Sequence, residues 1–129
     1  MVELLAPAGT KEAFLAAVEN GANAVYLAGK MFGARAYASN FDEDEMVEVI
    51  RHAHLKNVQV HVAVNTIVDS DELPRLKEYL AFLYDVGADA VLSQDLGAVR
   101  VAKKVVPQLP LHASTQMTVH NLAGVQALT

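Results

Sequence analysis

Residues 112–117, His-Ala-Ser-Thr-Gln-Met, carry the side chains of this sequence best suited to bind or activate a small molecule. The hydroxyl and amide groups of Ser114, Thr115 and Gln116 can orient a small polar ligand by hydrogen bonds. Ser114 is also a candidate nucleophile, provided that a base from elsewhere in the fold reaches it. His112 is a candidate for proton transfer, although a histidine inside a strand is more often buried and hydrogen bonded. The alternative is that these groups only satisfy one another.

Three further polar residues belong with this segment. Asn65 and Gln94 each end an apolar run, and the ends of parallel strands gather at one edge of a sheet, where binding sites form. We therefore expect both amides near Ser114, where they can help to orient a ligand. His120 follows closely and is another candidate for proton transfer.

Two basic residues, Lys30 and Arg35, lie between Gly29 and Phe41. This stretch is longer than a usual connection between a strand and a helix, and long loops in compact domains are often functional. Both cations can bind a carboxylate or phosphate, and the planar guanidinium of Arg35 can do so with two hydrogen bonds. The alternative is that both are solvated loop charges.

Several kinds of chemistry lack the residues that they need. The sequence has no Cys, so it supplies no disulfide, cysteine nucleophile or thiolate metal ligand. It has no His-Glu-x-x-His motif, and His52 and His54 are too close in sequence to share a helix face. No serine stands in a Gly-x-Ser-x-Gly elbow. We therefore predict no metal site in this chain. The sequence also offers little local support for a peptidase active site.

Composition indicates a folded domain. The 129 residues are 53% hydrophobic and carry a formal charge of −5, which suits a proper core and makes the chain alone a poor non-specific partner for nucleic acid. No apolar run is long enough to span a bilayer, and Glu3 stands where a signal peptide carries basic residues. We expect a cytoplasmic protein that does not bind membranes.

Five apolar runs alternate with five amphipathic stretches. The runs predict strands at 2–6, 24–28, 58–65 and 90–94, and a fifth, buried strand opened by Pro110. The stretches predict helices that start at the N-caps Thr10, Asp42 and Asp95, one over 71–86, and a last one holding Leu122, Val125 and Leu128. Strict alternation predicts a parallel α/β sheet with right-handed crossovers.

The third strand favours one of two possible architectures. Its valines, at even positions from 58 to 64, share one face, and Gln59, His61, Ala63 and Asn65 share the other. A mixed face suits a barrel interior rather than an open doubly wound sheet. A whole (β/α)8 barrel needs about 250 residues, and the last helix runs to Thr129 without a stop signal. We therefore predict a single domain over 1–129, the N-terminal part of a TIM-type barrel of five parallel βα units, cut in its last helix.

The stretches ELLAPAGTKEAFLAAVENGANAVYLAGKMFGARAYASNF, VNT, SQDLG and HASTQMTVHN occur in this order. They resemble the N-terminal half of the collagenase-like peptidases of unknown catalytic type, peptidase family U32, and the resemblance covers essentially the whole chain. It implies a (β/α)8-like barrel. It also implies a relation to proteins required for hydroxylation of tRNA uridine, ribosomal RNA cytidine or ubiquinone precursors, of which the RNA-hydroxylating members depend on prephenate.

The resemblance also implies an iron–sulfur cluster held by four Cys of the C-terminal half, which this chain does not contain. Three hypotheses remain open. The chain is the barrel portion of a protein of RNA hydroxylation that binds a small carboxylate such as prephenate and meets RNA only through the full-length protein. Alternatively, it belongs to a true peptidase. Finally, it is a non-catalytic scaffold whose exposed edges require a partner, either another copy or the rest of the barrel.

Overall fold

Five parallel strands form one sheet in the order in which they occur along the chain, β1-β2-β3-β4-β5. The computed structural model describes residues 2–34 and 38–129. The strands are β1 (Leu5–Pro7), β2 (Ala24–Leu27), β3 (Gln59–Val64), β4 (Ala90–Ser93) and β5 (Leu111–Ala113). The helices are α1 (Lys11–Glu19), α2 (Glu43–Leu55), α3 (Leu73–Asp85), α4 (Leu96–Val105) and α5 (Leu122–Leu128).

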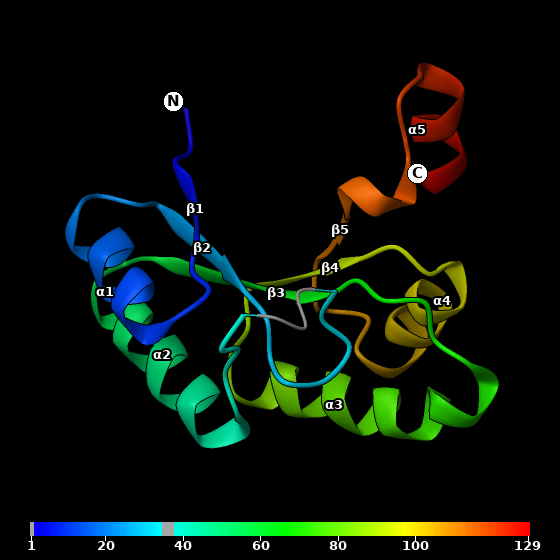
Figure 1. The fold of residues 1–129 in the computed structure, drawn as a ribbon. Coiled ribbons are helices and arrows are strands. Elements are labelled where there is room, and N and C mark those ends of the chain that lie inside the picture. Colours follow the sequence, from blue (N-terminus) through cyan, green and yellow to red (C-terminus); the bar gives the residue numbers. More distant parts are fainter. Residues whose placement is uncertain (1, 35–37) are drawn as a thin grey trace.

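The strand order decides between the two architectures. A doubly wound sheet reverses its order where the second half begins, and these five strands show no reversal. Helices α1 to α4 therefore all lie on one face of the sheet (Figure 1). This arrangement confirms the predicted α/β class and is consistent with part of a (β/α)8 barrel.

Capping side chains start the helices where the sequence predicts them. The Thr10 hydroxyl accepts a hydrogen bond from the Ala13 amide at the start of α1. The Asp42 carboxylate accepts one from Glu45, whose own carboxylate accepts one from the Asp42 amide, so α2 begins with a capping box. The Asp95 carboxylate accepts a hydrogen bond from the Ala98 amide at the start of α4.

The boundaries of several elements differ from the prediction, and those of the first strand and the third helix differ by more than one residue. The first strand begins at Leu5 rather than Val2, because hydrogen-bonded pairing with β2 begins there. A single 3-10 turn at Ser70–Glu72 precedes α3, so the α-helical part starts at Leu73 instead of position 71. Pro74 lies in the first turn of α3, where its missing N–H costs no helical hydrogen bond.

The core lies between the sheet and helices α1 to α4. The face of β3 that carries Val60, Val62 and Val64 is at most 1% exposed, as predicted from its alternation. Leu76, Leu80 and Leu83 of α3 belong to the same core cluster and are equally buried. None of the helices in residues 2–34 and 38–129 is long and apolar enough to cross a membrane.

Within residues 2–34 and 38–129, no helix covers the opposite face of the sheet (Figure 1), and this changes the surroundings of β5. The sequence predicts a buried fifth strand with a buried His112, but His112 and Ala113 are exposed. The prediction was wrong because β5 pairs only with β4 and its histidine points to the uncovered face. Helix α5 stands apart from the other four and buries none of its residues.

Candidate functional site

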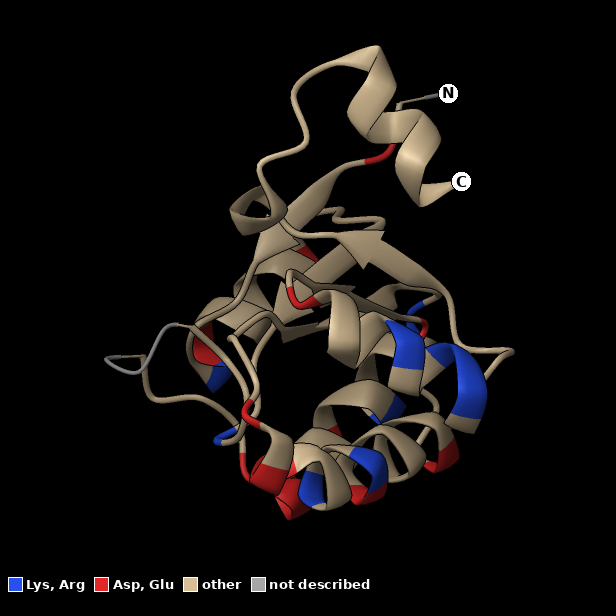
Figure 2. Ribbon diagram, turned by 90° about the vertical axis from the view of Figure 1, so that its right-hand side faces the viewer, with Lys and Arg blue, Asp and Glu red and all other residues tan. Residues whose placement is uncertain are grey.

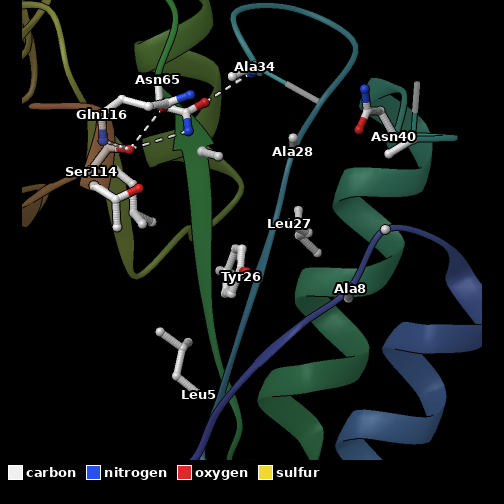
Figure 3. Close-up of a pocket in the computed structure, with 15 residues that line it drawn as sticks. Leu5, Ala8, Tyr26, Leu27, Ala28, Ala34, Asn40, Asn65, Ser114 and Gln116 are labelled. Atoms are coloured by element: carbon white, nitrogen blue, oxygen red, sulfur yellow. Dashed lines mark hydrogen bonds between the residues drawn. The ribbon is translucent and has the colours of Figure 1, made fainter. Parts of the chain in front are cut away.

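A pocket of about 400 Å³ lies on the uncovered side of the sheet, at the ends where the strands run out into their loops. Figure 3 shows lining side chains that come from β1, β2, β3 and the segment after β5. Its lining residues are Leu5, Ala8, Gly9, Tyr26, Leu27, Ala28, Ala34, Ala38, Asn40, Ala63, Asn65, Leu92, Ser114, Thr115 and Gln116. A pocket at this edge of a parallel sheet is where ligands bind in such folds.

Hydrogen bonds join three of the predicted site residues at one end of this pocket (Figure 3). The Ser114 hydroxyl donates to the Gln116 side-chain oxygen over 3.0 Å, and the Asn65 side-chain nitrogen reaches the same hydroxyl at 3.5 Å. Ser114 is only 6% exposed, whereas Gln116 is exposed to solvent. The Gln116 backbone amide donates to the hydroxyl as well, at 3.4 Å. In the described part of the chain its partners are therefore all amides, none of which is a base.

Asn65 also ties the pocket to neighbouring segments. Its side-chain oxygen accepts a hydrogen bond from the Ala34 amide at 3.0 Å, and its backbone amide donates to the Phe32 carbonyl at 2.9 Å. Its carbonyl accepts a hydrogen bond from the Gln94 side chain at 2.7 Å. Through these bonds Asn65 holds the long loop and Ser114 in place, and its side-chain oxygen can still accept a second hydrogen bond from a ligand.

Other predicted site residues lie elsewhere. Gln94 does not line this pocket but an adjoining hollow, together with His120, whose ring is bonded to the Thr118 carbonyl at 2.8 Å. Lys30 lines two other hollows on the side of α2 and α3. Arg35 lies outside the described residues, so its predicted role stays a prediction.

Sequence reasoning did not select the apolar and aromatic residues of the lining, among them Tyr26, Ala63 and Leu92. Ala63 lies on the predicted inner face of β3, and the alternation there was a sufficient signal. Tyr26 and Leu92 lie in β2 and β4, the four-residue strands AVYL and AVLS, in which polar and apolar residues do not alternate. Without alternation the sequence does not mark which side chains face the pocket, so register was needed: Tyr26 pairs with His61 and Leu92 with Ala63.

Two imidazoles meet on the same face. The rings of His61 and His112 are perpendicular, with 5.0 Å between their centroids. His61 is 5% exposed, and burial, followed by the charge of His112, lowers the pKa of the His61 ring below its ordinary value of 6.5, whereas Glu3 and Asp89 act in the opposite direction. His61 is therefore held neutral near pH 7.

The described lining of the pocket carries no charged side chain. In residues 2–34 and 38–129, no three His, Asp or Glu side chains come close enough to hold a metal ion. An iron–sulfur cluster does not fit the residues present, because its usual ligands are thiolates and the sequence has no Cys. The site can therefore bind and orient a polar molecule through amides and hydroxyls.

Fold and pocket together describe a parallel α/β chain that is consistent with part of a (β/α)8 barrel and has a pocket at the ends of its strands. The model of peptidase family U32 matches residues 9–129, and the chain belongs to this family.

Three named relatives are about one third identical to the chain over the aligned residues. An uncharacterized protease of Methanocaldococcus jannaschii is 39% identical over 94% of this chain and 29% of its own length. The 23S rRNA 5-hydroxycytidine synthase of Escherichia coli is 36% identical over 99% of this chain and 19% of its own length. The tRNA hydroxylation protein P1 of Bacillus subtilis is 32% identical over 96% of this chain and 29% of its own length. The chain thus spans less than a third of each of these relatives.

A solved structure of a U32 peptidase superposes with a TM-score of 0.77 at 16% identity, covering 96% of this chain and 53% of the other. At this identity the similarity concerns the fold alone, and it agrees with the partial barrel.

Proposed function

We propose that the chain is the barrel portion of a protein that acts in RNA hydroxylation, with tRNA as the target, and that its pocket binds a small carboxylate such as prephenate. Support comes from the names of two relatives, one acting on tRNA and one on ribosomal RNA. The observation that carries the proposal is the pocket whose polar end consists of Asn65, Ser114 and Gln116. An RNA target would place the protein in the cytoplasm.

The chemistry of the pocket favours binding over peptide cleavage. A serine nucleophile needs a neighbouring base, but the bonds that the structure describes join the Ser114 hydroxyl to amides. His112 contacts His61 rather than Ser114. We propose that any iron–sulfur cluster of the full-length protein is held by residues other than these 129.

Complementation of a gene deletion tests the proposal. Hydroxylated nucleosides in tRNA and ribosomal RNA are measured by mass spectrometry in the deletion strain and in strains that express wild type, Gln116→Ala or Gln108→Ala. Gln108 is an exposed glutamine outside the pocket and serves as the matched control. We expect wild type and Gln108→Ala to restore the modification, and Gln116→Ala to restore less of it at equal protein level. Failure of wild type to change any hydroxylated nucleoside would reject the proposal.

A true peptidase is the second candidate, because one relative is named a protease and another a collagenase. Purified protein is incubated with gelatin and casein, with Ser114→Ala as the control. We expect no cleavage. Reproducible cleavage that disappears in Ser114→Ala would replace the hydroxylation proposal by this one.

A further inference from the structure

The charges of this protein are distributed unevenly along the sequence. All 15 acidic residues lie before position 100, together with seven of the ten basic residues. That part carries a formal charge of −8, and residues 100–129 carry +3, which together give the overall −5. Such asymmetry, rather than net charge, indicates where an acidic protein can meet a polyanion.

All three positive charges of the second part lie on α4. Arg100, Lys103 and Lys104 are exposed, and their spacing of three and four residues puts them on one side of the helix. We call them the α4 ridge. Helix α4 contains no acidic residue, and within residues 2–34 and 38–129 none of the three forms an ion pair.

The other charged helices differ from α4. Helix α2 carries four acidic residues, Glu43, Asp44, Glu45 and Glu48, against one arginine, and α3 carries equal numbers of both signs. Figure 2 looks at the side where α4 lies in Figure 1, and basic and acidic segments alternate along the lower helices there. The α4 ridge is therefore a local positive surface on an acidic molecule.

Helix stability explains only part of the ridge. Lys103 and Lys104 lie in the last turn of α4, where cations interact favourably with the helix dipole. Arg100 lies in the middle of the helix, where this effect has decayed. The helix dipole therefore accounts for Lys103 and Lys104 but not for Arg100.

The ridge is close to the ligand site along the helix axis. Helix α4 begins at Leu96, which lines the hollow that adjoins the pocket and shares Gln116 with it. From Leu96 to Lys104 the helix rises by about 12 Å. Helix α4 lies on the outer face of the sheet (Figure 1). A bound polyanion that crosses the edge of the pocket can therefore continue over the α4 ridge.

We propose that the α4 ridge binds the phosphate backbone of an RNA whose modified segment lies at the pocket. Lys and Arg contacts to phosphates give affinity without sequence preference and fix the register of the nucleic acid. The choice of RNA as the polyanion rests on the proposed function, whereas the positive surface itself does not.

The test measures binding of an unmodified tRNA transcript to the full-length protein by fluorescence anisotropy at several salt concentrations. The variant is Arg100→Gln/Lys103→Gln/Lys104→Gln. The control is Arg51→Gln/Lys56→Gln/Lys77→Gln, which removes the same charge from exposed residues of α2, its C-cap and α3. We expect the slope of log affinity against log salt to fall by about 2–3 in the α4 variant, since each lost phosphate contact contributes roughly 0.7–0.9. The control should keep the wild-type slope.

Equal slopes for wild type, the α4 variant and the control would overturn the α4 site. So would unchanged tRNA binding combined with loss of binding to vesicles of anionic phospholipid, which would assign the ridge to a membrane surface. If the α4 variant alone loses tRNA binding while deletion of the gene changes no hydroxylated nucleoside, the α4 site stands and the proposed function fails.

Discussion

We propose that Arg35, which the sequence predicts to bind a carboxylate, supplies the positive charge for prephenate recognition in the full-length protein. Ala34 and Ala38 line the pocket on either side of it in sequence, and the described lining carries no charge. In the full-length protein, Arg35→Ala should weaken prephenate binding about tenfold to hundredfold, because a charge-assisted hydrogen bond contributes about 1.5–3 kcal/mol. Titration calorimetry measures this affinity.

Lys30→Ala is the matched control for this prediction, because Lys30 lines other hollows and its removal should leave the affinity unchanged. Unchanged affinity in a stably folded Arg35→Ala protein would place the carboxylate site elsewhere.

His61 makes stability depend on pH. Its pKa is lowered in the folded state, first by burial and then by His112, so the unfolded chain takes up the proton first as the pH falls. The free energy of unfolding should therefore decrease as the pH falls below about 6.5 and level off below the folded-state pKa. Urea unfolding at a series of pH values measures this.

His112→Ala should reduce this dependence on pH without removing it, because burial is the larger cause. His120→Ala is the control, since that exposed ring is bonded only to a backbone carbonyl in the part of the chain that the structure describes. A pH dependence identical in wild type and His112→Ala would contradict the role assigned to the pair.

At the scale of elements, the start of α2 depends on its capping box. Asp42→Ala should lower the free energy of unfolding by about 1 kcal/mol, because the Glu45 amide loses its acceptor at 2.8 Å. Asp42→Asn should cost far less, since asparagine caps about as well. Chemical denaturation of the three proteins measures both differences, and equal losses in the two variants would show that charge rather than capping matters.

Gly29 lets the end of β2 approach α3. A Cβ at this position would overlap the hydroxyl of Tyr79, a 4% exposed residue whose pKa burial raises to about 12. Gly29→Ala should therefore destabilise the protein by about 1–3 kcal/mol, and Tyr79→Phe in the same chain should recover part of the loss. At Gly9, a Cβ meets only Ala38 at an ordinary 3.8 Å, so Gly9→Ala is the control in thermal unfolding. If Tyr79→Phe recovers none of the stability lost in Gly29→Ala, overlap with the Tyr79 hydroxyl is not the cause of that loss.

For the whole molecule, the uncovered face and the two edge strands predict self-association. Strands β1 and β5 each pair on one side only, and Leu4, Leu122 and Val125 are 55%, 71% and 48% exposed. Such edges and apolar patches promote association, so we expect this chain to form dimers or larger species at micromolar concentration. Light scattering after size-exclusion chromatography measures the mass.

Leu122→Gln/Val125→Gln should shift that equilibrium toward the monomer. A monodisperse wild-type monomer would count against both the association and the hypothesis of a scaffold that needs a partner.

Local signals were sufficient for the elements of this protein. Caps such as Thr10, Asp42 and Asp95 act within one helical turn, and the alternation of valines in β3 depends only on strand geometry. The parallel α/β class followed from the order of elements, and the end of β3 and the segment after β5 supplied Asn65, Ser114 and Gln116. These features are local in the chain, so the sequence alone determined them.

Tertiary structure decided what depends on contacts between distant segments. His112 was predicted to be buried, but exposure depends on whether another layer covers that face of β5, and a strand carries no local mark of its neighbours. Lys30 points to the side of α2 and α3, which loop length could not predict. Strand register brought Tyr26 and Leu92 into the lining of the pocket. It also brought the rings of His61 and His112 together. Register depends on packing between strands rather than on local propensity, so the sequence alone did not predict either result.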